Sequence, residues 1–376
     1  MRRILIHSNA PTLPTGYGQQ TALLAPRLAA AGYEVAISAF AGIQGVTTAW
    51  QGHTVYPGGL DPYGGDVLPG HAARSGADLV LTLMDAWVLD PGMVNGLNAA
   101  CWMPVDCTPL SAMDRGFLRN SGARPIAMSD HGRGELQAAG WAPLYAPHAV
   151  DTSVFAPQDK TAARKIMGVP PGAYVIGVNA ANLDAVRKGF GEQMAAFAQF
   201  RKNHPEAVLL LHAHPAGPGS GCDLRDLAGR LDIAEAIRWS DPYRYTCGGF
   251  TTQDMARWYA CLDLYSGCAY AEGFGLPLLE AAACGIPSVA TSFSAMPQAA
   301  GPHAYLVATE PFWNARHRAW WGKPSVSGIA AAYEQAFKDD HDTDAIRGHA
   351  LACDADKVFA EHWLPVLAAL AEGGRC

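Results

Sequence analysis

Two glutamates, Glu272 and Glu280, and two glycines, Gly273 and Gly275, lie close together in the stretch EGFGLPLLEAAACGIP. Glycines carry no Cβ, so the backbone here can turn sharply and approach a ligand closely. The apolar spacing after Gly275 predicts a helix, and the free N–H groups and positive dipole end of a helix start favour an anion, a phosphate above all. The two carboxylates could accept hydrogen bonds from hydroxyl groups on either side of a diphosphate, as in a nucleotide sugar.

A solvated helix residue and an ordinary loop acid are the simplest alternative for such a glutamate pair, but the surrounding run is almost wholly apolar or small. The whole stretch EGFGLPLLEAAACGIPSVAT resembles the signature of the retaining GT-B glycosyltransferases, specifically glycosyltransferase family 4. The resemblance implies that Glu272 lies beside the transferred sugar and that Glu280 binds the ribose hydroxyls. It also places a further set of residues in the donor site through their backbone: Gly273, Phe274, Gly275 and Leu276.

Two adjacent cations, Arg187 and Lys188, follow a strand expected at 174–180. At the exit of a strand they could offset a diphosphate and stabilise the charge that develops on it as the sugar leaves. Composition alone would favour a solvated charge pair. The pair coincides with the Arg-Lys-Gly element of family 4, and the resemblance therefore implies a diphosphate role for both residues. Since no Asp-x-Asp run stands in a credible donor position, neither a metal nor another cofactor is expected.

The N-terminal region reads as a Rossmann-like unit, with a strand at 3–9, a glycine-containing loop, a helix at 19–31 and a strand at 34–40. Gly16 and Gly18 do not complete a GxGxxG pattern, and by spacing alone they fit a plain turn. The resemblance implies instead a loop that closes over the donor phosphate, with Gly16 as its closely approaching glycine. Residues 50–76, rich in Gly, Pro and Tyr, are expected to form a long loop without regular structure.

Three further expected strands, at 77–85, 98–106 and 124–130, each end in an aspartate. Carboxylates at the carboxyl ends of parallel strands are candidates for chemistry, although Asp130 runs directly into a helix and is expected mainly as its cap. Asp106 stands near the place where many family members carry a histidine that contacts donor and acceptor. A carboxylate cannot donate to a phosphate, so Asp106 is expected to orient an acceptor hydroxyl or accept its proton.

Two other groups of polar residues have weaker claims to a function. The basic group Arg115, Arg119 and Arg133 could bind an acidic acceptor, but scattered surface arginines are usually solvated. His212 and His214 end an apolar strand and could form a zinc pair by spacing; without a third ligand, core or pocket histidines are the better interpretation.

The 376 residues, 49% of them hydrophobic, suffice for two domains with separate cores. We expect an acceptor-side Rossmann-like domain at 1–155, a nucleotide-sugar domain at 156–355 and a C-terminal helix at 356–376 that crosses back. A net charge of −7 argues against stable nucleic-acid binding, although a modified base stays possible as acceptor. The nine cysteines form no Cys-x-x-Cys pair, so neither a disulfide framework nor a zinc ribbon is expected. Neither a signal peptide nor a membrane span is apparent, which predicts a cytoplasmic protein.

The combined prediction is an α/β protein of GT-B fold, with two Rossmann-like parallel-sheet domains facing each other across a cleft. The predicted activity is transfer of a sugar, a hexose by family resemblance, from a nucleoside diphosphate sugar to an acceptor hydroxyl with retention of configuration. UDP or GDP is expected as the nucleotide, and the acceptor stays open. A GT-B sugar-nucleotide epimerase and a non-catalytic sugar-nucleotide binding protein are the two alternatives.

Overall fold

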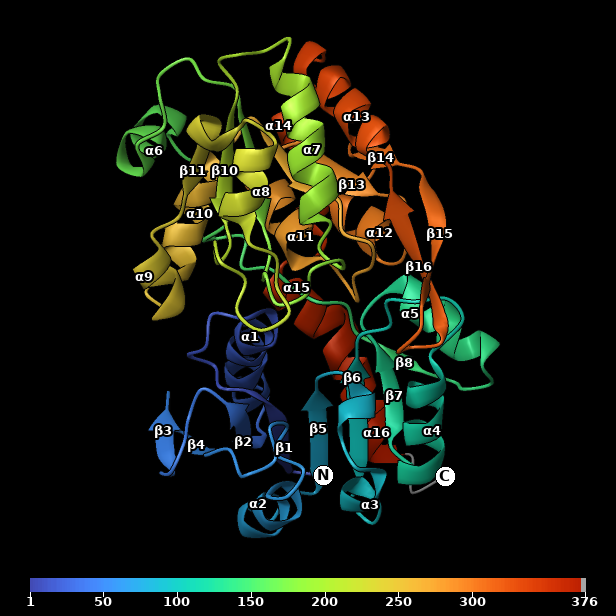
Figure 1. Ribbon diagram of the computed structural model, residues 1–376. Coiled ribbons are helices and arrows are strands. Elements are labelled where there is room, and N and C mark those ends of the chain that lie inside the picture. Colours follow the sequence, from blue (N-terminus) through green and yellow to red (C-terminus); the bar gives the residue numbers. More distant parts are fainter. Residues whose placement is uncertain (373–376) are drawn as a thin grey trace. The chain divides into compact units, whose positions relative to one another are not determined.

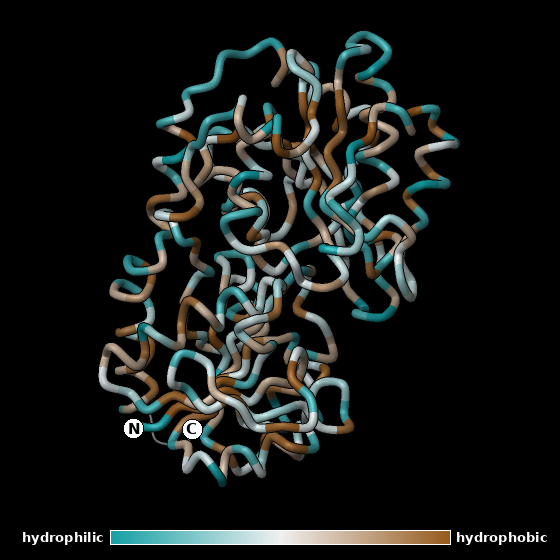
Figure 2. Tube along the Cα trace, turned by 90° about the vertical axis from the view of Figure 1, so that its left-hand side faces the viewer, coloured by the Kyte–Doolittle hydropathy of each residue, from teal (hydrophilic) through white to brown (hydrophobic). Residues whose placement is uncertain are grey.

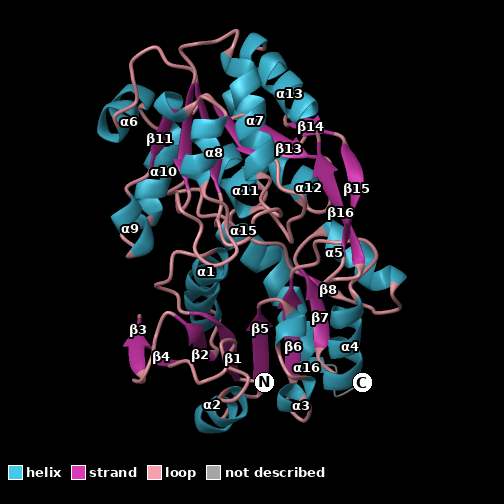
Figure 3. Ribbon diagram, viewed as in Figure 1, coloured by secondary structure: helices cyan, strands magenta, loops and turns pink. Residues whose placement is uncertain are grey.

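The computed structural model describes residues 1–372 and divides into two compact α/β units (Figures 1 and 3). Unit 1 comprises Met1–Ala149, the short segment Asn314–Ala319 and the chain from Cys353 onward; unit 2 comprises Val150–Trp313 and Trp320–Ala352. The chain thus passes into unit 2 after Ala149, whereas the sequence placed that boundary after residue 155.

Unit 1 is built on an eight-stranded sheet in the order β3-β4-β2-β1-β5-β6-β7-β8, in which only the β3–β4 pair is antiparallel. Its strands are β1 (Arg3–Asn9), β2 (Glu34–Ala41), β3 (Thr48–Trp50), β4 (His53–Tyr56), β5 (Leu79–Leu83), β6 (Ala99–Met103), β7 (Arg124–Ala127) and β8 (Leu144–Tyr145). Its helices are α1 (Gly16–Ala30), α2 (Leu68–Ser75), the 3-10 turn η1 (Ala86–Val88), α3 (Pro91–Val94), α4 (Ala112–Ser121) and α5 (Asp130–Ala138). The C-terminal part adds α15 (Ala355–Val358), the π-helical η3 (Phe359–Trp363) and α16 (Leu364–Glu372).

The centre of this sheet is apolar because β5 and β6 are buried along their whole length. The C-terminal helices pack against the strands and helices of the same unit. The rings of Trp363 and Trp102 contact edge to face, with their centroids 4.7 Å apart, and Arg27 Nη2 lies 2.8 Å from Asp356 Oδ1. Strands of continuous apolar sequence are typical of parallel sheets covered on both faces.

The expectation of a structureless loop at 50–76 was wrong. His53 and Val55 are buried while Thr54 is exposed, and this alternation makes β4 a strand that pairs in parallel with β2. In α2, Leu68, His71 and Ala72 are buried at helical spacing. The glycines and prolines that suggested a loop are confined mostly to the segment between these two elements.

Helix α1 also begins earlier than expected, at Gly16. The side chain of Thr15 accepts a hydrogen bond from the Gly18 N–H at 3.1 Å, which is an ordinary N-cap. Gly16 and Gly18 therefore belong to the first turn of α1.

Unit 2 carries an all-parallel six-stranded sheet in the order β11-β10-β9-β12-β13-β14. Its strands are β9 (Val175–Asn179), β10 (Val208–His212), β11 (Ile237–Trp239), β12 (Leu264–Gly267), β13 (Ser288–Thr291) and β14 (Tyr305–Val307). Two further strands, β15 (Thr309–Asn314) and β16 (Ala319–Pro324), form a separate two-stranded sheet.

Helices of unit 2 alternate with these strands, as the sequence predicted. They are α6 (Lys160–Met167), α7 (Phe190–Arg201), α8 (Leu224–Arg230), η2 (Ala234–Ala236), α9 (Pro242–Thr246), α10 (Thr252–Ala260), α11 (Leu276–Ala283), α12 (Met296–Ala300), α13 (Val326–Lys338) and α14 (Thr343–Leu351). Colouring by hydropathy shows brown, hydrophobic stretches inside each unit and teal stretches on outer loops (Figure 2). The predicted α/β class with Rossmann-like parallel sheets is confirmed.

Helix α11, the helix of the predicted signature, is buried at every residue except Pro277, which is half-buried. Arg347 of α14 holds the last turn of this helix by donating a hydrogen bond to the Ala283 carbonyl. The same guanidinium donates to the carbonyls of Phe155 and Thr152, each at 3.0 Å. One side chain therefore joins the end of α11 to the first residues of unit 2.

Candidate functional site

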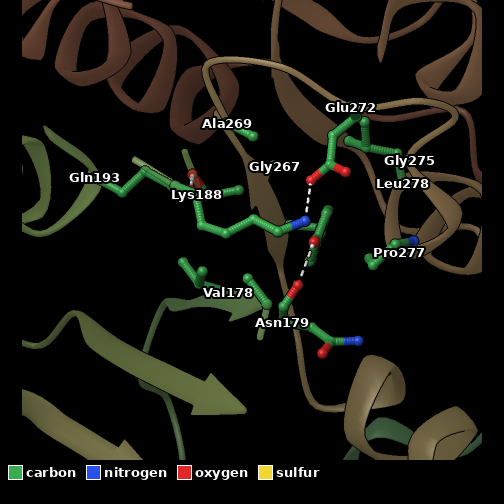
Figure 4. Close-up of a pocket in the computed structure, with 13 residues that line it drawn as sticks. Val178, Asn179, Lys188, Gln193, Gly267, Ala269, Glu272, Gly275, Pro277 and Leu278 are labelled. Carbon is green, nitrogen blue, oxygen red and sulfur yellow. Dashed lines mark hydrogen bonds and ion pairs between the residues drawn. The ribbon is translucent and has the colours of Figure 1, made fainter. Parts of the chain in front are cut away.

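A pocket in unit 2 lies where three elements meet: the carboxyl end of β9, the carboxyl end of β12 and the start of α11 (Figure 4). The carboxyl ends of parallel strands are where ligands bind in open α/β sheets. The residues lining it are Val178, Asn179, Ala180, Lys188, Gln193, Tyr265, Ser266, Gly267, Ala269, Glu272, Gly275, Pro277 and Leu278.

The two predicted cations and the first glutamate contact one another in this region. The Lys188 Nζ pairs with Glu272 Oε1, as Figure 4 shows, and the Arg187 Nη1 lies 3.3 Å from Glu272 Oε2. Burial alone would raise the pKa of Glu272, but Lys188 and Arg187 hold that pKa below its usual value. Glu272 is thus an anion held between two cations, and unit 2 has an anion-binding arrangement at this point.

The backbone that carries the cations is fixed by two side chains. Asp184 Oδ1 accepts a hydrogen bond from the Arg187 N–H at 2.7 Å, which forms a tight turn. Gln193 donates to the Lys188 carbonyl at 2.8 Å and accepts from the Ser266 hydroxyl at 2.7 Å. Gln193 therefore ties the cationic turn to strand β12 and orients Lys188 toward the pocket.

Glycine is required at two positions around the pocket. Gly189 has a φ of +59°, and a Cβ there would lie 2.3 Å from the Cys268 carbonyl oxygen. Gly275, with a φ of +100°, is the N-cap of α11 and offers no side chain to its first N–H groups. The expected phosphate-binding helix start stays a prediction, because the Leu278 N–H already donates to the Gly275 carbonyl at 2.9 Å and Pro277 has no N–H.

Glu280 does not line the pocket, but a chain of hydrogen bonds joins it to a residue that does. The Tyr259 hydroxyl donates to Glu280 Oε2 at 2.7 Å, and Asn179 Nδ2 donates to the Tyr259 oxygen at 3.0 Å. Burial raises the pKa of Glu280 to about 7, and the hydrogen bond from Tyr259 acts in the opposite direction. Tyr259 and Asn179 were not predicted from the sequence, because no spacing in the sequence relates them to Glu280.

The other members of the predicted donor set surround this group. Phe274 and Leu276 are buried, and Gly273 is half-buried. Of the predicted residues, the structure brings together Arg187, Lys188, Glu272 and Gly275 most directly.

Gly16 and Asp106 lie in unit 1, so their predicted contacts with a donor bound in unit 2 stay predictions. Asp85 accepts a long hydrogen bond from the Tyr17 hydroxyl at 3.4 Å. At the start of α5, Ser129 rather than Asp130 caps the helix, and Asp130 pairs with Arg133 at 2.7 Å. The hypothesis that Asp130 is the cap was therefore off by one residue.

One set of potential metal ligands occurs among residues 1–372: Asp106, Cys107 and His317, all in unit 1, whose ligand atoms lie within 4.8 Å of one another. The mixed carboxylate, thiol and imidazole donors would suit a zinc-like ion. His212 is not in this set; it is half-buried among aromatic rings, and its Nδ1 is hydrogen-bonded to the Ser240 hydroxyl at 2.9 Å. These contacts fit the interpretation as a core or pocket histidine.

The predicted basic group of unit 1 is partly engaged in local packing. The Arg133 guanidinium lies 4.6 Å from the Tyr145 ring centroid, and that of Arg119 lies 6.0 Å from the Trp141 ring centroid. These contacts fit surface arginines that cover aromatic rings.

Comparison with known sequences identifies the central part of the chain. The pattern of the family Glycosyl transferases group 1 matches residues 176–316, which include the cationic turn and helix α11. This segment of the chain is similar to the glycosyl transferases group 1 family. This match agrees with the resemblance to glycosyltransferase family 4.

Curated relatives match part of the chain. A D-inositol 3-phosphate glycosyltransferase from Stackebrandtia nassauensis is 35% identical over 152 residues, which cover 39% of this chain and 32% of the relative. A second such enzyme, from Catenulispora acidiphila, is 34% identical over 147 residues, which cover 38% of this chain and 32% of the relative. The match thus spans about a third of the length of these curated relatives.

Solved structures match the whole chain in fold. Sucrose-phosphate synthase from Thermosynechococcus elongatus has a TM-score of 0.76 at 15% identity and covers 99% of this chain and 100% of its own. HepE from Anabaena, solved in complex with UDP and glucose, has a TM-score of 0.71 at 16% identity. The match covers 98% of this chain and 100% of HepE. The predicted GT-B fold is confirmed. No helix within residues 1–372 has the length and apolar character that crossing a membrane requires.

Proposed function

We propose that this protein transfers a sugar from a nucleoside diphosphate sugar to an acceptor hydroxyl, with retention of anomeric configuration and without a metal on the departing diphosphate. The observation that carries the proposal is the cluster in which Arg187 and Lys188 contact Glu272 near the start of α11, where Gly275 offers no capping side chain. The segment similar to the group 1 family contains all of these residues.

In the proposed mechanism the diphosphate of the donor takes the place of the Glu272 carboxylate between the two cations. Glu272 then turns to hydroxyls of the transferred sugar, the role that the family resemblance implies for it. As the bond to the sugar breaks, negative charge grows on the diphosphate, and fixed N–H and cationic groups stabilise that charge without reorganisation.

The remaining predicted residues complete the proposal. Glu280 binds the ribose hydroxyls, Gly16 approaches the donor phosphate, and Asp106 orients the acceptor hydroxyl or accepts its proton. If Asp106 only orients the acceptor hydroxyl, an oxygen of the leaving diphosphate takes the proton instead. In both cases the acceptor attacks from the side that the diphosphate leaves, which accounts for retention. UDP or GDP as the nucleotide and a cytoplasmic location are part of the proposal, and HepE, a structural neighbour, was solved with UDP and glucose.

The test incubates the protein with UDP- and GDP-sugars and follows nucleotide release with and without candidate acceptors. Release that depends on an acceptor supports transfer, and an α-configured product from an α-configured donor supports retention. Conversion of the donor alone into its epimer would favour the epimerase alternative. Binding without turnover under all conditions would favour the non-catalytic binding protein.

A chelator tests the metal-free part of the proposal. Addition of EDTA should leave the affinity for UDP or GDP unchanged, because both charges that face the diphosphate come from side chains. A large loss of affinity, restored by Mg²⁺ or Mn²⁺, would contradict it.

A further inference from the structure

Tyr259 occupies an unusual position for a tyrosine of a helix core. It is fully buried in α10, yet its hydroxyl lies between two polar groups, the Asn179 amide and the Glu280 carboxylate. A phenol has one hydrogen to donate, and here that hydrogen points to Glu280 Oε2 while the oxygen accepts from Asn179. Hydrogen bonds are therefore donated in one direction, from Asn179 to Tyr259 and from Tyr259 to Glu280.

The Asn179 end of this chain is itself held in place. The Asn179 carbonyl accepts a hydrogen bond from the Tyr265 hydroxyl at 3.2 Å, which Figure 4 draws as a dashed line, and Asn179 lines the pocket. Tyr265 is also fully buried. The pocket wall and the Glu280 carboxylate are thus connected by groups that have little freedom to move.

Only one oxygen of Glu280 is engaged by this chain. Tyr259 occupies Oε2, and within residues 1–372 no hydrogen bond to Oε1 accompanies it. A carboxylate oxygen has about two acceptor positions. Oε1 can therefore accept from both hydroxyls of a vicinal diol, provided that the carboxylate is ionised and does not rotate.

We propose that Tyr259, supported by Asn179, is a positioning residue that presents Glu280 Oε1 to the two ribose hydroxyls of the nucleotide and makes the site selective for ribonucleotides over 2′-deoxyribonucleotides. This inference rests on the proposed role of Glu280 in donor binding. The phenol donates to the ionised carboxylate, so it also favours the charged form of a group that burial would otherwise keep neutral.

The experiment measures the affinities for UDP, GDP and their 2′-deoxy counterparts by calorimetry, in the wild type and in Tyr259→Phe, between pH 6 and pH 9. The readout is the ratio of ribo to deoxyribo affinity, because ionisation of the phosphates affects both nucleotides equally. We expect the wild-type ratio to rise with pH as Glu280 ionises. In Tyr259→Phe the ratio should fall by about 10-fold, since hydrogen bonds to charged groups are worth roughly that much, and the midpoint of its rise should move to higher pH.

A matched control is available in the same unit. Tyr305 also donates from its phenol to a carboxylate, Asp339, at 2.8 Å, away from the pocket. Tyr305→Phe should therefore keep the wild-type ratio and midpoint. If Tyr259→Phe does not fold, Asn179→Ala removes the support of the phenol and should lower the ratio in the same direction.

The outcomes separate the two proposals. A wild type that binds neither UDP nor GDP contradicts the proposed function, and with it this role of Tyr259. A wild type that binds them, with an unchanged ratio and midpoint in both variants, contradicts the positioning role alone. An equal loss of affinity for ribo and deoxyribo nucleotides would reduce Tyr259 to a packing residue and also overturn the inference.

Discussion

The two units differ in how they hold the residues that the sequence singled out. In unit 2, Arg187, Lys188 and Glu272 contact one another, and Gln193 fixes the turn that carries the cations. In unit 1, Asp130 is engaged with Arg133 at a helix start, and Asp85 with Tyr17. Two cations against one carboxylate leave a net positive charge in unit 2 that an anionic ligand could balance, whereas the Asp130–Arg133 pair of unit 1 is balanced already. The charged residues of the candidate site in unit 2 are therefore in contact in the absence of a ligand.

The sharpest way to break this comparison is to remove both cations of unit 2. The double variant Arg187→Ala, Lys188→Ala should lower kcat by at least about 10²–10³-fold, the loss typical of a single missing transition-state donor. Arg187→Ala alone should cost turnover more than affinity. Steady-state rates of nucleotide release measure both effects.

The control is Arg225→Ala, which removes an exposed cation of α8 outside the pocket. Its rates should match the wild type. If the double variant also keeps the wild-type rate, the diphosphate role of the two cations is wrong.

Unit 1 is tested by Asp106→Asn. Because the amide cannot accept a proton, transfer to the acceptor should fall by about 10²-fold, a typical contribution of a general base. Release of nucleotide without an acceptor should fall far less. The ratio of transfer to hydrolysis is the measurement, with the exposed Asp340→Asn as control. Equal losses in both reactions would place Asp106 outside the acceptor step.

Gly189→Ala tests the turn of unit 2 that carries Arg187 and Lys188, because the substitution should destabilise that turn and leave unit 1 unchanged. The new Cβ would meet the Cys268 carbonyl at 2.3 Å in a left-handed conformation, so the free energy of unfolding should fall by about 2 kcal/mol. Gly191→Ala, two residues on and within α7, has no heavy atom within 4 Å of its new Cβ, so it should leave the free energy of unfolding unchanged or raise it by up to about 1 kcal/mol. Urea unfolding of both variants checks this, and equal stability would contradict the packing described here.

Two buried acids, one in each unit, change stability only as the pH changes. Burial raises the pKa of Glu280 in unit 2 and of Asp114 in unit 1 to about 7 in each case. As the pH rises above their ordinary values, the unfolded chain loses these protons first, so ionisation destabilises the folded state progressively up to about pH 7. Each contributes roughly 3 kcal/mol by linkage.

Replacing either acid by its amide should therefore reduce the loss of stability between pH 5 and pH 8. Thermal unfolding of Glu280→Gln and Asp114→Asn at both pH values measures the change against the wild type. Only Glu280→Gln should also weaken nucleotide binding, because Asp114 belongs to the buried core of α4. Parallel pH dependence in wild type and variants would contradict the burial of these charges.

Much of the fold could be predicted, because the strands of both units are short apolar runs and the helices between them have regular apolar spacing. Strand β1 begins and ends where the sequence placed it, and strand β2 is one residue longer than expected. Strand β4, next to the edge strand β3, and helix α2 were missed, since their glycine-rich neighbours suggested a loop and short, half-buried elements give a weak pattern.

The candidate site was predictable only where its residues are adjacent in the sequence. Arg187 with Lys188, and Glu272 with Gly275, form short recognisable patterns. Tyr259 lies 21 residues from Glu280, and Asn179 lies 80 residues from Tyr259. Their contact depends on how α10 packs beside β9 and α11, which is a property of tertiary structure and leaves no periodic trace.

Helix α11 is anchored at both ends, with its first turn at the pocket and its last carbonyl gripped by Arg347, which also grips Thr152 and Phe155. A short, buried helix that is fixed in this way behaves as a rigid rod. We therefore expect a displacement of residues 152–155, where the chain enters unit 2, to move the pocket end of α11 as well.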